Sequence, residues 1–260
     1  MNKPLLTSLL PASAAGAAGG GWRTLHFSAL LIVLAASPST YAAGNRHRLA
    51  SQVWRICSHT APPFVLLSAL ASLVLVHIVV VTAQSYGLSQ FALGTVVRVL
   101  VVELLPLSAA LFVALRAGAA FNAEVASRRR ERDPQQGEAD LIRDIVLPRV
   151  AGSAVAVLLL ATISGALALL IAYLGVYGFT PWGVSSFTQT VGQVFNPVVL
   201  MTLTLKTLLF AIAVATIPAS AGLANRQHNA DPSVAVLHGT IRLFTVLVVI
   251  EILSLTLEFI

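Results

Sequence analysis

The chain has 260 residues, of which 57% are hydrophobic and only 10% are charged. Soluble globular domains carry charge at about a quarter of their positions, so this composition excludes an ordinary soluble protein and indicates a membrane-embedded one. The net charge of +6 does not indicate nucleic-acid binding, because an excess of basic over acidic residues in a membrane protein usually reflects the composition of its loops. A single cysteine, Cys57, excludes an internal disulfide and any cysteine-based metal or redox motif.

The N-terminal segment, residues 1–44, is expected to lie outside the membrane domain. Residues 1–22 are rich in Ala, Gly and Ser and predict a disordered leader. The apolar run at 25–36 fits either a signal peptide or a helix lying in the membrane interface. The basic cluster between Arg46 and Arg55 follows this run and would be exported with a signal peptide, so it favours the interfacial helix.

Residues 45–260 predict one membrane domain. No Asp, Glu, Lys or Arg occurs at residues 56–97 or 150–205. Because a helix needs roughly 20 apolar residues to cross a bilayer, the apolar runs predict five spanning helices. Pro62-Pro63 is expected to open the first. The predicted spans are 63–83, 93–115, 148–173, 197–223 and 238–260, and residues 116–147 form the one long hydrophilic loop.

The connection between the third and fourth spans is uncharged and rich in aromatic residues, namely Tyr177, Phe179, Trp182, Phe187 and Phe195. Aromatic residues at this density mark a membrane–water interface. Thr180-Pro181 is a favourable helix start, with a hydroxyl that can cap and a proline at the first helical position. We therefore expect a short helix over 181–194 that lies on this surface.

The distribution of basic residues predicts the orientation of the chain. Of 16 Lys and Arg residues, five lie in the N-terminal segment, seven at 116–149 and two at 226–242. Cytoplasmic loops of membrane proteins carry such an excess. The N-terminus, the long loop and the last turn are therefore expected in the cytoplasm, and the aromatic connection and the C-terminus on the outside.

Three ionisable residues fall inside the predicted spans. Glu103, Lys206 and Glu251 each lie about ten residues from the outer end of their span, or roughly 15 Å deep at 1.5 Å per residue. Ionisable groups at that depth are costly unless they pair or face water, so equal depths predict one cluster, with Glu103 and Lys206 as the first pair. Such a cluster fits either a polar lining of a substrate route or a structural ion pair.

No catalytic or metal site is expected in this chain. It has no P-loop, no Ser/His/Asp arrangement on a loop and no paired catalytic carboxylates outside the predicted bilayer. Its six histidines show no metal-ligand spacing, and His77, inside the first span, is more simply a group hydrogen-bonded to a neighbouring helix. The basic run from Arg128 to Arg132 fits either a topology anchor beside anionic lipid or a docking surface for a cytoplasmic partner.

Three short motifs stand out in and after the second predicted span, namely Glu103-Leu-Leu-Pro106, Ala114-Leu-Arg116-Ala-Gly118 and Ala123-Glu124. They resemble the signature of the MlaE/YrbE-type permeases, which is Glu-x-x-Pro followed by Ala-Gly-Arg-x-Gly and Ala-Glu. Leu115 replaces the glycine that precedes the signature arginine. Leu147-Pro148-Arg149 opens the third span as in the family, and the resemblance extends over residues 50–260.

The resemblance implies the permease subunit of an ABC-type transporter that moves phospholipid between the inner and outer membranes. Such permeases form homodimers in the bacterial inner membrane and have an interfacial helix and five spans. They work with a separate cytoplasmic ATPase, which binds the ATP, and with a periplasmic MCE-domain protein. The resemblance also implies that Glu103, Lys206 and Glu251, with Arg98 on the second span, lie near a lipid cavity.

Two departures from the family pattern stand out. The family usually has an arginine directly before the signature glutamate, whereas this chain has Val102 and its nearest arginine is Arg98. Where the family carries a coupling helix, this chain has an Arg-rich segment that Pro134 and Gly137 would interrupt. An alternative is therefore a non-transporting paralogue that assembles with or regulates a true permease. The residues expected to contact an ATPase are Glu124, Arg128, Arg129, Arg130, Arg132 and Arg143.

Overall fold

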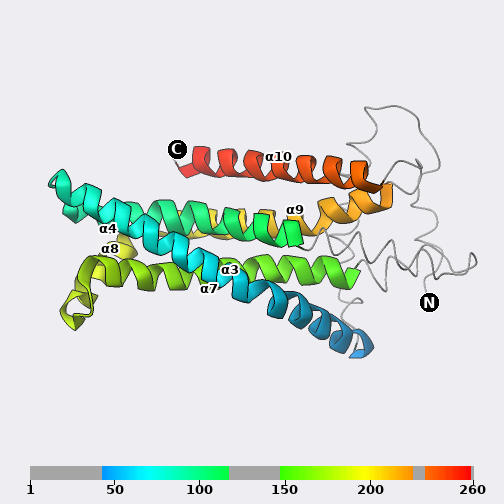
Figure 1. Ribbon diagram of the computed structural model, residues 1–260, viewed down its shortest axis with the longest axis horizontal. Helices are drawn as coiled ribbons and strands as arrows, with labels where there is room; N and C mark the ends of the chain where they lie inside the picture. The colour runs from blue at the N-terminus through cyan, green and yellow to red at the C-terminus, as the bar shows by residue number, and fades with distance from the viewer. Residues whose placement is uncertain (1–42, 117–146, 225–231, 259–260) are drawn as a thin grey trace, which may run out of the picture.

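The computed structural model describes residues 43–116, 147–224 and 232–258, and every regular element in these ranges is a helix. Successive spans run in opposite directions along the long axis of the molecule (Figure 1). The predicted all-α architecture with five membrane spans is confirmed. The interfacial helix expected at 25–36 and nearly all of the loop 116–147 lie outside the described residues. Five helical stretches are long and apolar enough to cross a membrane, namely Cys57–Ser85, Phe91–Arg116, Val150–Tyr177, Pro197–Pro218 and Gly239–Leu257.

The first helix, α3, runs unbroken from Ala43 to Ser85 and contains both Pro62 and Pro63. The prolines were expected to open the span, but the helix continues through them. Both proline rings are exposed and so displace no packed neighbour, and membrane helices tolerate proline where nearby groups satisfy the freed backbone. At 1.5 Å per residue α3 is about 65 Å long, twice the hydrocarbon core, so it extends well beyond the membrane.

The second span consists of three helical segments in direct succession. An α-helix, α4, covers Ser89–Val96, a π-helix, η2, covers Val97–Leu104, and α-helix continues over residues 105–116. The amide of Leu105 donates to the carbonyl of Leu100, which is the i→i+5 bond of a π-helix. Sequence patterns do not indicate a π-helix here, because its apolar composition suits either kind of helix.

The third and fourth spans are α7, Leu147–Tyr177, and α9, Pro197–Ala224. Between them lie a turn with Gly178 at φ 67°, the short 3-10 helix η4, Pro181–Gly183, and α8, Val184–Val194. The helix predicted over 181–194 is therefore present. Its predicted hydroxyl cap is wrong, because the Thr180 hydroxyl donates to the carbonyl of Tyr177 at 2.8 Å and does not cap η4.

The last helix, α10, covers Pro232–Glu258 and packs mainly against α9 (Figure 1). The most extensive helix pair is α3 with α7, which cross obliquely. Two apolar clusters fill the interior. One joins α3, α7, α9, α10 and residues 105–116 around Phe64, Leu160, Phe210 and Leu247. The other joins α3, α4, η2 and α7 around Val76, Val97, Leu100 and Ala172.

Candidate polar site within the membrane

Lys206 lies on α9 and is among the largest fully buried side chains of the described residues. Its ammonium forms ion pairs with Glu103 on η2 and with Glu251 on α10, the latter at 2.9 Å. The carbonyl oxygen of Val102 lies 3.5 Å from the same nitrogen. Three helices that are distant in sequence thus meet at one lysine, and we call Glu103, Lys206 and Glu251 the Lys206 cluster.

The backbone of the second span helps to form this site. In an α-helix the carbonyl of residue 102 would accept from the amide of residue 106, but Pro106 has no N–H. The π-helical segment ends at Leu104, two residues before this proline. The Val102 carbonyl is therefore an acceptor without an α-helical donor, and it lies beside Lys206. Glu103, the first residue of the Glu-x-x-Pro motif, and the backbone oxygen of the residue before it accordingly lie at the same ammonium.

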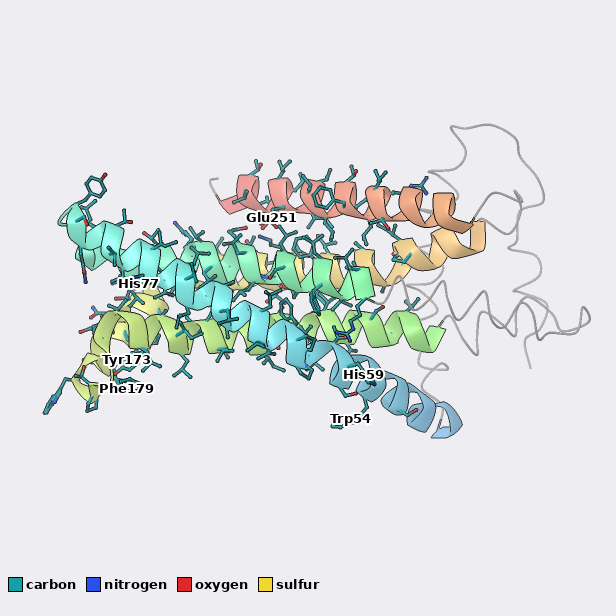
Figure 2. The ribbon with its side chains drawn as sticks, viewed as in Figure 1. Trp54, His59, His77, Tyr173, Phe179 and Glu251 are labelled. Carbon is teal, nitrogen blue, oxygen red and sulfur yellow. The ribbon has the colours of Figure 1, made fainter. Side chains whose placement is uncertain are left out.

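Burial differs sharply between the members of the cluster. The Lys206 side chain is 1% exposed, whereas the side chains of Glu103 and Glu251 are 15% and 16% exposed. Figure 2 shows Glu251 on the side of α10 that faces the other helices. Transfer of charges out of water costs several kcal/mol per ion unless they are paired and hydrogen-bonded. The carboxylates therefore stabilise a lysine that α9 could not bury alone.

Two buried polar atoms of α10 lie at the same site. Oε2 of Glu251 and the hydroxyl of Ser254, three residues further on, have no hydrogen-bond partner among the described residues. Residues three apart on a helix share a face. Ser254 was not singled out from the sequence, because serine is common in membrane helices and only its burial beside Glu251 distinguishes it.

The structure does not place every expected site residue in the cluster. Arg98 lies on η2, five residues before Glu103, and its side chain is exposed. Pro106 is buried, Arg116 is exposed at the end of its span, and Pro148 and Arg149 lie in the first turn of α7. His77 is exposed on α3 (Figure 2). Outside the described residues lie Gly118, Glu124, Arg128, Arg129, Arg130, Arg132 and Arg143.

The arrangement brings opposite charges together inside a bundle of helices that can span a membrane. Within the described ranges no group of three or more His, Cys, Asp or Glu residues could hold a metal ion. The cluster holds a buried ammonium and two largely buried carboxylates within three of the candidate spans. Intramembrane ionisable residues in such settings typically mark a substrate or ion pathway.

Comparison with known protein families identifies the fold. The family described as Permease MlaE matches residues 49–257, which includes all five spans and the Lys206 cluster. The chain belongs to the MlaE permease family. A search of curated proteins found no match. Membership makes the chain a multi-pass membrane permease, consistent with five apolar helices and a buried charged cluster.

Proposed function

We propose that this chain is the permease subunit of an ABC-type transporter that moves phospholipid between the inner and outer bacterial membranes. The observation that carries the proposal is the Lys206 cluster, which holds an ion-paired lysine inside a helix bundle that belongs to the MlaE permease family. A purely structural bundle does not need such a group, because apolar side chains of similar volume pack at least as well. A route for a headgroup through the bilayer does need polar groups at this depth.

The proposed orientation places the helix ends at residues 116, 147, 224 and 232 in the cytoplasm. These ends lie at one end of the molecule, and α8 and the end of α10 lie at the other (Figure 1). Arg116 and Arg149 lie at these ends and Arg242 in the first half of α10, whereas α8 carries no charge. The positive-inside rule therefore supports this orientation.

The proposed partners are a second permease copy, a cytoplasmic ABC ATPase and a periplasmic MCE-domain protein. ATP would bind to the ATPase, so this chain would need no cofactor of its own. Many apolar side chains point outward from the bundle, among them Leu66, Leu70, Ile252 and Leu253. Lipid and a second copy are the natural neighbours of such a surface in a bilayer.

The alternative function is a non-transporting paralogue that assembles with or regulates a true permease. It is favoured by the Arg-rich segment at 124–145, because its Pro134 and Gly137 would be expected to interrupt a coupling helix. This segment lies outside the described residues. The two functions differ in whether an ATPase engages the chain.

Affinity purification of the tagged chain from its native membrane in mild detergent tests the proposal. We expect an ABC ATPase and an MCE-domain protein to co-elute in stoichiometric amounts, as identified by mass spectrometry. Recovery with another permease but without any ATPase would instead support the regulatory paralogue. Removal of residues 128–137 is the matched variant, and it should release the ATPase without releasing the second permease copy.

A further inference from the structure

The hydrogen-bond donors of Lys206 are all engaged within the protein. An ammonium has three N–H donors, and this one faces a carboxyl oxygen of Glu103, Oε1 of Glu251 at 2.9 Å and the Val102 carbonyl at 3.5 Å. The side chain is also 1% exposed. The lysine therefore has no donor left for any further oxygen at the site.

The second carboxyl oxygen of Glu251 lacks a donor. This atom, Oε2, is buried and forms no hydrogen bond among the described residues. The hydroxyl of Ser254, on the same face of α10, forms none either, so it does not donate to Oε2. Buried polar atoms in native proteins are nearly always hydrogen-bonded, so each such case needs an explanation. Oε2 needs a donor that neither Lys206 nor Ser254 provides.

The charges of the Lys206 cluster do not balance. One ammonium faces two carboxyl groups, which leaves one negative charge if both are ionised. The other charged groups with described side chains on η2, α9 and α10 are Arg98 and Arg242, and both are exposed. A buried charge without a partner is costly. One added proton would remove this charge.

The two carboxyl groups are placed to share a proton. Both bond to the same ammonium, and the side chains of Glu103 and Glu251 also lie close enough for a hydrogen bond to each other. Two ionised carboxylates cannot form that bond, because each only accepts. Like charges at such close range do not readily ionise together, so two carboxyl groups at one site tend to hold a proton between them.

We propose that the Lys206 cluster is a proton-binding site, in which Glu103 and Glu251 share one proton beside the Lys206 ammonium. The proton makes the cluster electrically neutral and gives Oε2 of Glu251 a hydrogen-bond partner. It also links α10 directly to η2, whereas α10 otherwise packs mainly against α9. The proton is lost as the pH rises, so its contribution to holding α10 in place falls at alkaline pH.

Infrared spectroscopy of the purified full chain tests the proposal. The protein is held in a maltoside detergent, which has no carbonyl group to obscure the C=O stretch of a protonated carboxyl group. Ionised carboxylates and amides do not absorb in that region. At neutral pH the wild-type chain should show a band equivalent to about one carboxyl group. The band should shift in D2O and disappear at alkaline pH, whereas the ester bands of co-purified lipid do neither.

Two conservative variants locate the proton. Glu103→Gln and Glu251→Gln each leave one carboxylate opposite one ammonium, so either change should abolish the band. Glu258→Gln, seven residues further along α10, is the matched control and should leave the band unchanged. Size-exclusion chromatography would confirm that each variant is folded, and one folded variant is enough for the test. The absence of the band from the wild-type protein at neutral pH would overturn the proposal, and so would a band that persists in a folded variant.

The pH dependence of unfolding is a second, independent measurement. On SDS titration the wild-type chain should lose more stability between neutral and alkaline pH than Glu251→Gln, because only the wild-type chain has the shared proton to lose. An equal loss in the two proteins would overturn the proposal. The proton site goes beyond the proposed transport function, and neither measurement depends on whether the chain moves lipid.

Discussion

The α3–α7 pair and the α9–α10 pair hold membrane helices together by different interactions. Along α3 and α7 the buried hydroxyls bond within their own helix, as Ser72 does to Ser68 and Ser164 to Leu160, each at 2.6 Å. The contact between these helices is apolar and close. By contrast, α10 is joined to α9 by the ion pair of Glu251 and Lys206 in addition to apolar contacts around Phe210 and Leu247. Shape thus determines the first pair, whereas the second depends on charge as well as shape and should respond to substitutions that leave the shape almost unchanged.

The largest effect is expected from removing the central charge. Lys206→Ala leaves two carboxylates buried beside one another, and breaking a buried ion pair in this way typically costs about 3–5 kcal/mol. Unfolding of the purified protein by SDS titration in mixed micelles would measure the loss. The variant Glu103→Gln/Lys206→Met/Glu251→Gln removes all three charges, so it leaves no buried charge without a partner and should recover most of the stability. If both variants were equally unstable, charge would not be what holds α10.

A smaller effect is expected at the closest approach of α3 and α7. A Cβ atom at Gly175 would lie 2.5 Å from Cγ1 of Val76, whose β-branched side chain has little freedom to move. Gly175→Ala should therefore destabilise the protein by about 1–3 kcal/mol. The second substitution Val76→Ala should relieve the overlap, and thermal unfolding of the single and double variants would show this.

Gly192 on α8 is the matched control for that overlap. A Cβ atom at this position meets nothing within 4 Å. Gly192→Ala should then raise the stability by about 0.5–1 kcal/mol, because alanine favours a helix more than glycine does. If Gly192→Ala lost as much stability as Gly175→Ala, the overlap with Val76 would not explain the loss at Gly175.

The smallest effect is expected from the hydroxyls of the α3–α7 pair. Ser72 is buried, but its hydroxyl donates to a carbonyl of its own helix. Ser72→Ala should therefore change the free energy of unfolding by about 0.5 kcal/mol or less, near the average for polar contacts in membrane proteins. A loss of 2 kcal/mol or more, of the order found for stranded buried polar groups, would indicate an interhelical bond and weaken the contrast between the two pairs.

The sequence predicts the spans well because hydropathy measures what a bilayer requires, which is the length of an apolar run. Equal depths along their spans also indicated a cluster of Glu103, Lys206 and Glu251, which the structure brings together. The continuation of α3 through Pro62-Pro63 was not predicted, because local rules treat proline as a helix boundary.

The detailed geometry of the site could not be predicted from the sequence. The Val102 carbonyl that lies beside Lys206 belongs to the π-helix η2, and no periodicity distinguishes η2 from an α-helix. Ser254 stands out only through its burial beside Glu251. The Thr180 hydroxyl was expected to cap the next helix, but it bonds backwards to Tyr177, since the turn at Gly178 brings that carbonyl within reach.

The most direct test of the account is lipid transfer by the reconstituted assembly, comparing the wild-type chain with Glu103→Gln/Lys206→Met/Glu251→Gln. Transfer of fluorescent phospholipid between membranes would be followed after addition of ATP, and assembly would be checked by size-exclusion chromatography. The account predicts that the triple variant assembles normally and transfers lipid at least tenfold more slowly. Normal transfer by a normally assembled variant would contradict it, because the Lys206 cluster would then serve only to hold the helices together.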